Sequence, residues 1–267
     1  MKRTILTSVA ILVFVFVLAA CGGSNKEMNK LETILKNGTI IAGTSADYPP
    51  FEYVDAAGEM AGFDVDMMNE IAKQLGVKLE WVDMPFDSLI AAVQEGKIDA
   101  SISAFNYSEE RDQTIDFTKE YYMSEDAYIV AEGFSGQLVN PEDIASFIVG
   151  VQTGTTQDGW LTDNLVDAGK MPEENLFRYD RADQAAMDLK NGRIEVWMAD
   201  YVPGQALVDQ LGGLKVIYKG VLSSGPMNII VPNGDTALAE EMNKIIVQLE
   251  SEGFIKDLAI KFIGGIQ

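Results

Sequence analysis

Three groups of polar residues in this chain carry complementary charges. Segment 150–157 leaves an apolar run and starts a helix, so its backbone N–H groups and the hydroxyls of Thr155 and Thr156 converge where an anion is favoured. Arg111 offers a planar fork of donors that suits a carboxylate. Asp200 ends another apolar run and offers a carboxylate to an ammonium group. Together these groups predict a site for a zwitterion, and the commonest zwitterion is an α-amino acid.

Each group also has a simpler interpretation. Threonine is a frequent helix cap, so Thr155 or Thr156 could serve that purpose alone. Arg111 follows Ser108 and two glutamates, as many solvated surface arginines do, although a cation in the first turn of a helix opposes the helix dipole. Asp200 could cap the turn that follows it. Taken separately these alternatives stay open, and only the combination favours a binding site.

The elements that position these residues alternate between strand and helix. Short apolar runs and helical patterns follow one another from residue 36 onward, which is typical of α/β units on a largely parallel sheet. Asp64 is expected to cap the first long helix and Gly76 to end it. The expected elements are a strand at 39–43, a helix at 64–75, a strand at 79–82, a helix at 86–95, a strand at 98–104 and a C-terminal helix that Gly253 ends.

An internal similarity predicts two lobes. Segments 86–104 and 182–200 both read as helix, Gly, base, Ile, acid and strand, at an offset of 96 residues. In open α/β sheets, binding groups collect at the carboxyl ends of the strands. Ser45, Ser103 and Ala104 should therefore line one rim of a cleft, and segment 152–157 and Asp200 the other.

Composition excludes several classes of function. The chain has 267 residues, 20 Lys and Arg, 41 Asp and Glu and no His, which gives a formal charge of −21. A negative field repels phosphate backbones, so nucleic-acid binding is not expected. Without His there is no Ser-His-Asp or Cys-His nucleophile and no His-containing zinc site. Carboxylate chemistry or simple binding remains, and we expect no catalytic residue, no metal and no cofactor.

The N-terminus reads as a targeting segment. Lys2 and Arg3 precede an apolar run at 5–18, which predicts a signal peptide over 1–20, the alternative being an uncleaved membrane anchor. The ending Leu-Ala-Ala-Cys21 resembles the lipobox of bacterial lipoproteins, in which the Cys carries a lipid. We expect Cys21 to be lipidated and residues 21–35 to form a tether. Removing residues 1–20 takes away two cations and no acid, which makes the charge −23.

From about residue 31 to the C-terminus the sequence resembles family 3 of the bacterial extracytoplasmic solute-binding proteins, the amino-acid receptors of ABC importers. The resemblance rests on TSADYPPFEY (44–53), GFDVD (62–66), GKIDA (96–100), SEER (108–111), IDFT (115–118), YY (121–122) and GTTQ (154–157). It implies a two-lobed α/β periplasmic-binding-protein fold of type II, closed by hinge bending at two crossings near 123–127 and 222–227. Lobe 1 is then expected at 36–124 plus 226–267, and lobe 2 at 125–225.

The resemblance also implies roles for the candidate residues. Arg111, with Thr155 and Thr156, would bind the ligand carboxylate, and Asp200 its ammonium group. Tyr48 and Phe86 would sandwich the ligand side chain, unless they only pack in the core. The full predicted set of ligand contacts is Ser45, Tyr48, Phe86, Ser103, Ala104, Asn106, Arg111, Thr153, Thr155, Thr156 and Asp200.

Two departures from the family pattern bear on the ligand. Asn106 stands where Ser or Thr is usual, and its amide still forms hydrogen bonds. Ser45 stands where binders of basic amino acids often carry Asp, which argues against a cationic ligand. Facing aromatic rings and a strongly negative protein argue for one. The sequence thus favours Arg or Lys over Gln.

The resemblance also implies where the protein works and with what. The expected protein is a monomer, lipid-anchored on the outer face of the cell membrane, that delivers a free L-amino acid to an ABC permease. Two alternatives remain: a carboxylate-dependent cyclohexadienyl or arogenate dehydratase on the same scaffold, and a receptor partner that presents its ligand to a membrane sensor.

Overall fold

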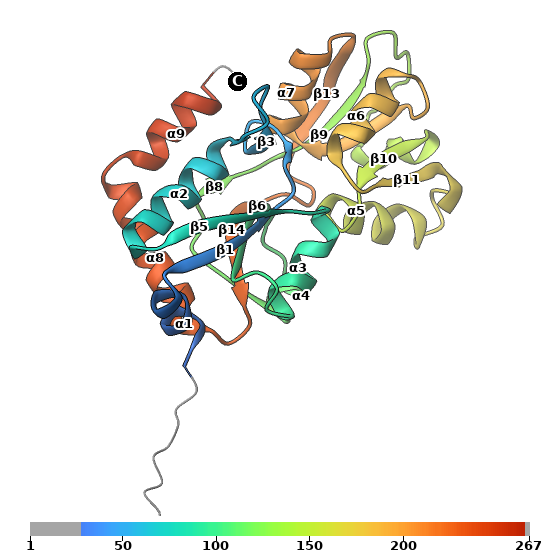
Figure 1. Ribbon diagram of the computed structural model, residues 1–267. Coiled ribbons are helices and arrows are strands. Elements are labelled where there is room, and N and C mark those ends of the chain that lie inside the picture. The colour runs from blue at the N-terminus through green and yellow to red at the C-terminus, as the bar shows by residue number, and fades with distance from the viewer. Residues whose placement is uncertain (1–27, 265–267) are drawn as a thin grey trace, which may run out of the picture.

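The computed structural model describes residues 28–264 and folds them into two α/β lobes, each built on its own sheet (Figure 1). The predicted two-lobed fold is confirmed. The predicted signal peptide at 1–20 and the lipidated Cys21 lie outside the described residues. None of the helices within 28–264 has the length and apolar character needed to cross a membrane.

The first sheet forms lobe 1. Its strand order is β5-β1-β6-β14-β7, with β8 paired to β14; β5, β1 and β6 are parallel and β14 runs antiparallel to β6. The strands are β1 (Thr39–Thr44), β5 (Lys78–Asp83), β6 (Ala100–Asn106), β7 (Ile115–Phe117), β8 (Tyr122–Met123) and β14 (Pro226–Pro232). Its helices are α1 (Lys30–Asn37), α2 (Phe63–Leu75), α3 (Phe86–Gln94), α4 (Glu109–Asp112), α8 (Thr236–Ser251) and α9 (Phe254–Phe262).

A small three-stranded sheet in lobe 1 carries part of the site. It consists of β2 (Asp47–Tyr48), β3 (Glu52–Val54) and β4 (Met60–Ala61), all antiparallel. Gly62 follows β4 with φ of 133°, and a Cβ there would lie 2.0 Å from the carbonyl oxygen of Phe51, so only glycine fits. This tight connection turns the chain straight into α2.

Two local predictions for lobe 1 are wrong. Gly62, not Asp64, occupies the cap position of α2, and Asp64 is instead buried in its first turn. Residues 30–35, expected in the tether, belong to α1, where the Asn29 and Glu32 side chains form a reciprocal capping box. The buried Ile34 anchors this helix to the lobe.

The second sheet forms lobe 2, with strand order β11-β10-β12-β9-β13. The strands are β9 (Asp126–Ala131), β10 (Val149–Gln152), β11 (Leu176–Tyr179), β12 (Val196–Asp200) and β13 (Leu214–Gly220). Its helices are α5 (Thr156–Leu161), α6 (Ala182–Lys190) and α7 (Tyr201–Leu211), with 3-10 turns at Pro141–Ser146 and Glu173–Asn175 and a π turn at Thr162–Val166.

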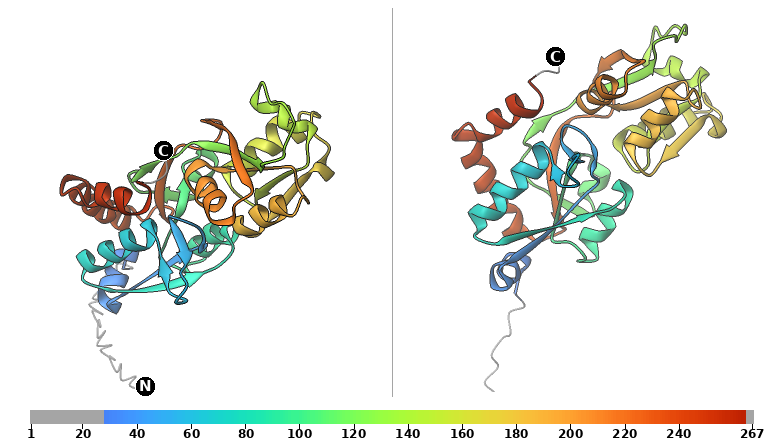
Figure 2. Two further views of the ribbon diagram at one scale, coloured as in Figure 1. Left: turned by 90° about the horizontal axis from the view of Figure 1, so that it is seen from above. Right: turned by 45° about the horizontal axis from the view of Figure 1, so that its top comes forward.

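The chain passes between the lobes twice. It leaves the first sheet after β8 and enters the second at β9, then returns between β13 and β14. Figure 2 shows the lobes side by side, with the blue and cyan elements and the red C-terminal helices in lobe 1 and the yellow elements in lobe 2. The C-terminal helices α8 and α9 therefore complete the N-terminal lobe. The exact residue boundaries given above for the lobes stay a prediction.

The helices of lobe 1 bury the faces that their sequence periodicity indicates. Met67, Met68 and Ile71 of α2 have no exposed surface, and neither have Leu238 and Met242 of α8. These faces pack into one continuous core. The packing holds α2 and the strands beside it in fixed positions, and with them the pocket residues at the ends of β1 and β6.

Candidate functional site

One pocket lies between the two lobes, at the carboxyl ends of β1, β6, β10 and β12. Its lining residues are Ser45, Asp47, Tyr48, Glu52, Phe86, Ser103, Ala104, Asn106, Arg111, Gln152, Thr155, Thr156, Gln157 and Asp200. Ten of the eleven predicted contacts are among them. Thr153 is not, because its hydroxyl donates to the carbonyl of Tyr179, 3.1 Å away.

Arg111 is a buried cation. It sits in α4, where its backbone N–H donates to the capping hydroxyl of Ser108 at 3.2 Å. Its guanidinium lies over the rings of Phe86 and Phe105, 5.5 Å from each ring centre, and these cation–π contacts hold it in place. Only 8% of the residue is exposed, so the interpretation as a solvated surface arginine is wrong.

The guanidinium of Arg111 forms no salt bridge with any acid of the described residues, and the negative charges of Asp200 and Glu110 act on it only from a greater distance. Nη1 donates to the carbonyl of Asn106 at 2.7 Å, and Nη2 donates to the carbonyl of Gly154 in lobe 2 at 2.8 Å. Burial lowers the pKa of Arg111 to about 10, so the group remains a cation at neutral pH. A buried cation without an anion is costly, and this one has unused N–H donors at the pocket. The arrangement is suited to an anionic ligand group.

Asp200 is a buried anion from the opposite lobe. It precedes α7 in the cap position, but its side chain makes no capping hydrogen bond, so the simpler interpretation of this residue is wrong. Its carboxylate accepts hydrogen bonds from the hydroxyls of Ser124, Ser224 (2.7 Å) and Tyr48 (3.0 Å), and from the amide of Asn106 (3.2 Å).

No Lys or Arg within residues 28–264 forms a salt bridge with Asp200. Burial raises the pKa of this carboxyl, while the serine hydroxyls hold it down. Polar donors can hold a buried carboxylate, but a cation beside it would add an attraction that neutral groups lack. Asp200 therefore suits a ligand ammonium group.

The loop before α5 packs closely against lobe 1. Gly154 has φ of 75°, and a Cβ there would lie 3.1 Å from Cβ of Asp87 in α3. Thr155 caps α5, its hydroxyl accepting the N–H of Asp158 at 3.1 Å and donating to the carbonyl of Gln152 at 2.8 Å. The capping interpretation is thus correct for Thr155, which also lines the pocket.

Ala104 has the only positive φ, 48°, among the non-glycine residues described in 28–264. Its N–H donates to Asp64 at 2.8 Å, which helps to hold this strained conformation at the pocket wall.

The model of the bacterial extracellular solute-binding proteins, family 3, matches residues 40–265. This protein belongs to that family.

Individual relatives of this solute-binding protein cover nearly the whole chain. An L-arginine-binding protein of Pseudomonas aeruginosa is 32% identical over 92% of this chain and 95% of its own. A mutant of ArgBP from T. maritima superposes with a TM-score of 0.80 at 34% identity, covering 88% of this chain and 99% of that one. An ancestral arginine-binding protein bound to arginine gives a TM-score of 0.79 at 33% identity, covering 85% and 98%.

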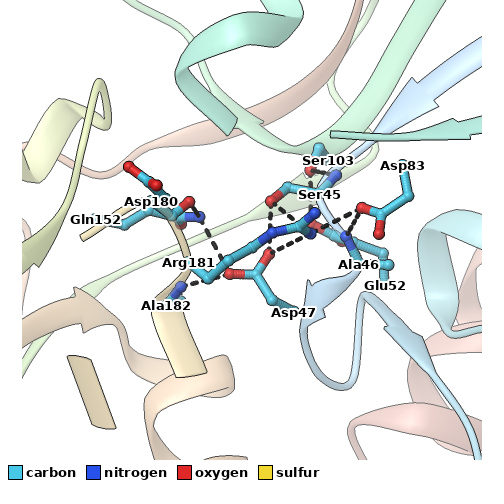
Figure 3. Close-up of polar contacts among 10 residues, drawn as sticks. All are labelled: Ser45, Ala46, Asp47, Glu52, Asp83, Ser103, Gln152, Asp180, Arg181 and Ala182. Carbon is cyan, nitrogen blue, oxygen red and sulfur yellow. Dashed lines mark hydrogen bonds and ion pairs between the residues drawn. The ribbon is translucent and has the colours of Figure 1, made fainter. Parts of the chain in front are cut away.

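Two acidic pocket residues of this solute-binding protein were not predicted as site residues. Asp47 accepts hydrogen bonds from Ser45 Oγ at 2.6 Å, Gln152 Nε2 at 3.2 Å and the N–H of Ala182 (Figure 3). Burial raises its pKa to about 6. Glu52 accepts a hydrogen bond from Ser103 Oγ at 2.8 Å, and burial raises its pKa well above the usual value. Both acids lie in segment 44–53, whose residues drew attention as a family motif and not as chemistry.

The pocket also contains Gln152 and Gln157, the two ends of the segment that was expected at the rim, although neither was among the predicted ligand contacts. Gln157 Nε2 donates to Ser224 Oγ at 2.9 Å, which extends the hydroxyl cluster around Asp200. The part of the chain that the structure describes has no cluster of three or more His, Cys, Asp or Glu arranged to hold a metal ion. The lining residues of the pocket present charged groups and hydrogen-bond donors and acceptors.

Proposed function

We propose that this protein captures a free L-amino acid with a cationic side chain, Arg or Lys in preference to Gln, and delivers it to an ABC permease. The observation that carries the proposal is the pair of buried, unpaired opposite charges, Arg111 from lobe 1 and Asp200 from lobe 2, in one pocket. An α-amino acid supplies both missing partners at once. Removing both charges from water costs free energy unless such partners are present.

The remaining lining residues match the rest of such a ligand. The hydroxyl of Ser103, the backbone of Ala104 and the amide of Asn106 border the head group, and Tyr48 and Phe86 present aromatic rings to the side chain. We retain the predicted contacts from Ser45, Thr155 and Thr156. Thr153 is the weakest of the eleven, because its hydroxyl is already bonded to a backbone carbonyl outside the pocket.

The acids Asp47 and Glu52 favour a cationic side chain. Arg111 is the only Lys or Arg among the described lining residues, and we assign it to the ligand carboxylate. Two carboxyl groups then face the far end of the ligand: Asp47 has Arg181 at 3.9 Å, and Glu52 forms no salt bridge with any Lys or Arg of residues 28–264. Ser45 replaces the usual Asp of basic amino-acid binders, and Asp47, two residues further on, supplies a carboxyl group in its place. The three relatives described above are named for arginine, which supports this choice.

Closure of the lobes follows from the placement of the two charges. The ligand head group bridges Arg111 and Asp200, so its binding favours the state in which the lobes meet. In the structure Arg111 already reaches Gly154, and Tyr48 reaches Asp200, across the cleft. We propose that the closed form is what the permease recognises.

We also propose that the protein is a monomer held outside the cell membrane by a lipid on Cys21. Replacing Cys21 by Ser should leave the protein unprocessed or released into the medium, with no incorporation of labelled fatty acid. A wild-type protein that incorporates no labelled fatty acid contradicts the anchor.

The function is tested by a ligand screen with the purified protein. Thermal unfolding is measured with L-arginine, L-lysine, L-glutamine, D-arginine and L-argininamide, because a ligand at 100 times its Kd adds about 2.7 kcal/mol of stability. L-arginine or L-lysine should give the largest shift, and the amide, which lacks the carboxylate, should give none. A largest shift with L-glutamine overturns the cationic ligand, and no shift with any amino acid overturns the function.

The dehydratase alternative needs a test of its own, because Glu52 is a buried acid with a raised pKa at the pocket. We propose that the protein is nevertheless a binder and not an enzyme. Incubation with prephenate or arogenate should then yield no aromatic product by absorbance.

The other alternative is that the protein presents its ligand to a membrane sensor instead of a permease. Every binding experiment would give the same result for both roles. Growth of a gene-deletion strain on the ligand as sole nitrogen source separates them.

A further inference from the structure

A buried pair of carboxyl groups lies at the wall of the pocket. Glu52, at the start of β3, lines the pocket and is 1% exposed, and Asp64, in the first turn of α2, is completely buried behind it. The two side chains are within hydrogen-bonding reach of each other. Neither forms a salt bridge with any Lys or Arg of residues 28–264.

Each of these carboxyl groups has one oxygen without a hydrogen-bond donor. Asp64 Oδ2 accepts from the N–H of Ala104 at 2.8 Å and from the hydroxyl of Tyr121 at 2.9 Å, while Asp64 Oδ1 has no partner. Glu52 Oε1 accepts from Ser103 Oγ, while Glu52 Oε2 has no partner. One proton on Glu52 Oε2, donated to Asp64 Oδ1, satisfies both oxygens with a single hydrogen bond.

The donors around the pair decide which residue holds the proton. Asp64 receives two hydrogen bonds, which stabilise its charged form, and Glu52 receives one. Burial raises the pKa of both groups, to about 6 for Asp64 and well above the usual value for Glu52, where the negative charge of Asp64 adds to the rise. The other titratable groups that face Glu52 are Asp47 of β2 and the phenols of Tyr48 and Tyr121, and none of them is a cation.

We propose that Glu52 and Asp64 share a single proton in the free protein, and that a cationic ligand side chain expels it on binding. The inference rests on the proposed function, since it needs a ligand cation near Glu52. In a pocket of low dielectric, a nearby positive charge favours the ionised form of an acid. Binding of arginine or lysine then releases up to one proton to the solvent, whereas glutamine, which has the same head group and no side-chain charge, releases none.

This chain is well suited to the measurement. It contains no His, and the pKa of Asp47 is about 6, so Asp47 is ionised at pH 7.5. The buried tyrosines Tyr48 and Tyr121 have pKa values raised above 10 and keep their protons. Burial also raises the pKa of Asp200, but this residue faces the head group that arginine and glutamine share. A proton released at pH 7.5 with arginine and not with glutamine therefore points to the Glu52–Asp64 pair.

The experiment is calorimetric titration of L-arginine and L-glutamine at pH 7.5 in phosphate and in Tris, whose different ionisation enthalpies give the number of protons released. Arginine should release between a few tenths and one proton, and its affinity should rise by up to about tenfold per pH unit where release is complete. Glutamine should release none. Glu52→Gln should abolish the release, and Glu59→Gln, an exposed acid beyond the same strand, should leave it unchanged.

The outcomes separate the two proposals. If glutamine binds and neither arginine nor lysine does, the cationic-ligand function fails, and this inference fails with it. If arginine binds with equal heats in both buffers, or if Glu52→Gln releases as many protons as the wild type, only the inference is overturned. Should Glu52→Gln fold poorly, the infrared difference spectrum of the wild type decides: arginine should remove a protonated-carboxyl band, and a spectrum without that loss contradicts the proposal.

Discussion

Arg181 of lobe 2 and Asp83 of lobe 1 form an ion pair across the cleft, with 2.7 Å between Nη1 and Oδ1 (Figure 3). Neither residue lines the pocket. The same guanidinium group lies 3.9 Å from Asp47 and 3.4 Å from Ser45 Oγ. Arg181 thus connects the lobes beside the proposed ligand site without occupying it, and we expect it to stabilise the proposed closed state.

Removing the ion pair of Arg181 and Asp83 should weaken the binding of every ligand to the same extent. Asp83→Asn keeps the oxygen that accepts the N–H of Ala46 and loses the charge. Because the pair is partly exposed, we expect a loss of about 0.2–1 kcal/mol, or up to about fivefold in Kd, that shrinks at high salt. Calorimetry with two amino acids checks this. Glu80→Gln, which alters a pair within lobe 1, is the control and should have no effect; a change in ligand preference with Asp83→Asn would place the pair in the site.

Arg111→Ala should abolish most binding. A buried charge pair loses about 2–5 kcal/mol when one partner is truncated, so Kd should rise at least about thirtyfold. Arg111→Lys keeps the charge but not the planar fork and should recover only part of the loss. Titration with the amino acid and its amide measures both variants, with the exposed Arg193→Ala as control. Unchanged affinity in Arg111→Ala would separate this residue from the ligand.

Asp47 should make the protein less stable as the pH rises from about 4 to about 6. Its pKa in the folded protein, about 6, lies above the ordinary value of 3.8, so the folded state holds a proton that the unfolded state has already lost. Ionisation of the buried group therefore costs up to about 3 kcal/mol above pH 6. Asp47→Asn should remove this dependence. Urea unfolding of both proteins at pH 4 and 7 measures it, and an equal pH dependence in the two would refute the assignment.

Ligand binding should make the protein more compact. The proposed head-group partners lie on opposite lobes, so the free protein is expected to populate an open state that the ligand closes. X-ray scattering should show a smaller radius of gyration with saturating ligand. A radius that stays the same would argue against a hinged clamp, and Arg111→Ala, which removes one anchor, should retain the larger radius at the same ligand concentration.

The sequence by itself determined the architecture and most of the pocket. Alternating apolar runs and helical periodicity depend on local chemistry, so they indicated the α/β lobes, and strand ends indicated the two rims of the cleft, one of them with Asp200. Arg111 was indicated by its misfit at a helix start and by the family resemblance. The capping box of Asn29 and Glu32 is also a local signal. It could have predicted α1 from the sequence, although a tether was expected there. By contrast, the sequence pattern predicted Asp64 as the cap of α2. The tight turn at Gly62 starts the helix two residues earlier, so Asp64 lies in the first turn and is buried in the core.

Only the tertiary structure decided the acidic half of the site. Asp47 and Glu52 lie in a polar segment where acids are normally solvated, and their burial depends on the closing of lobe 2 and on the packing of β3 against α2. Glu52 and Asp64 each have one buried oxygen without a hydrogen-bond partner. The two side chains come together because β3 packs against α2, which the spacing of the residues in the sequence does not indicate. Arg181 and Asp83 are 98 residues apart and meet only across the cleft. Burial and pairing of charges are long-range properties, and a local sequence pattern does not carry them.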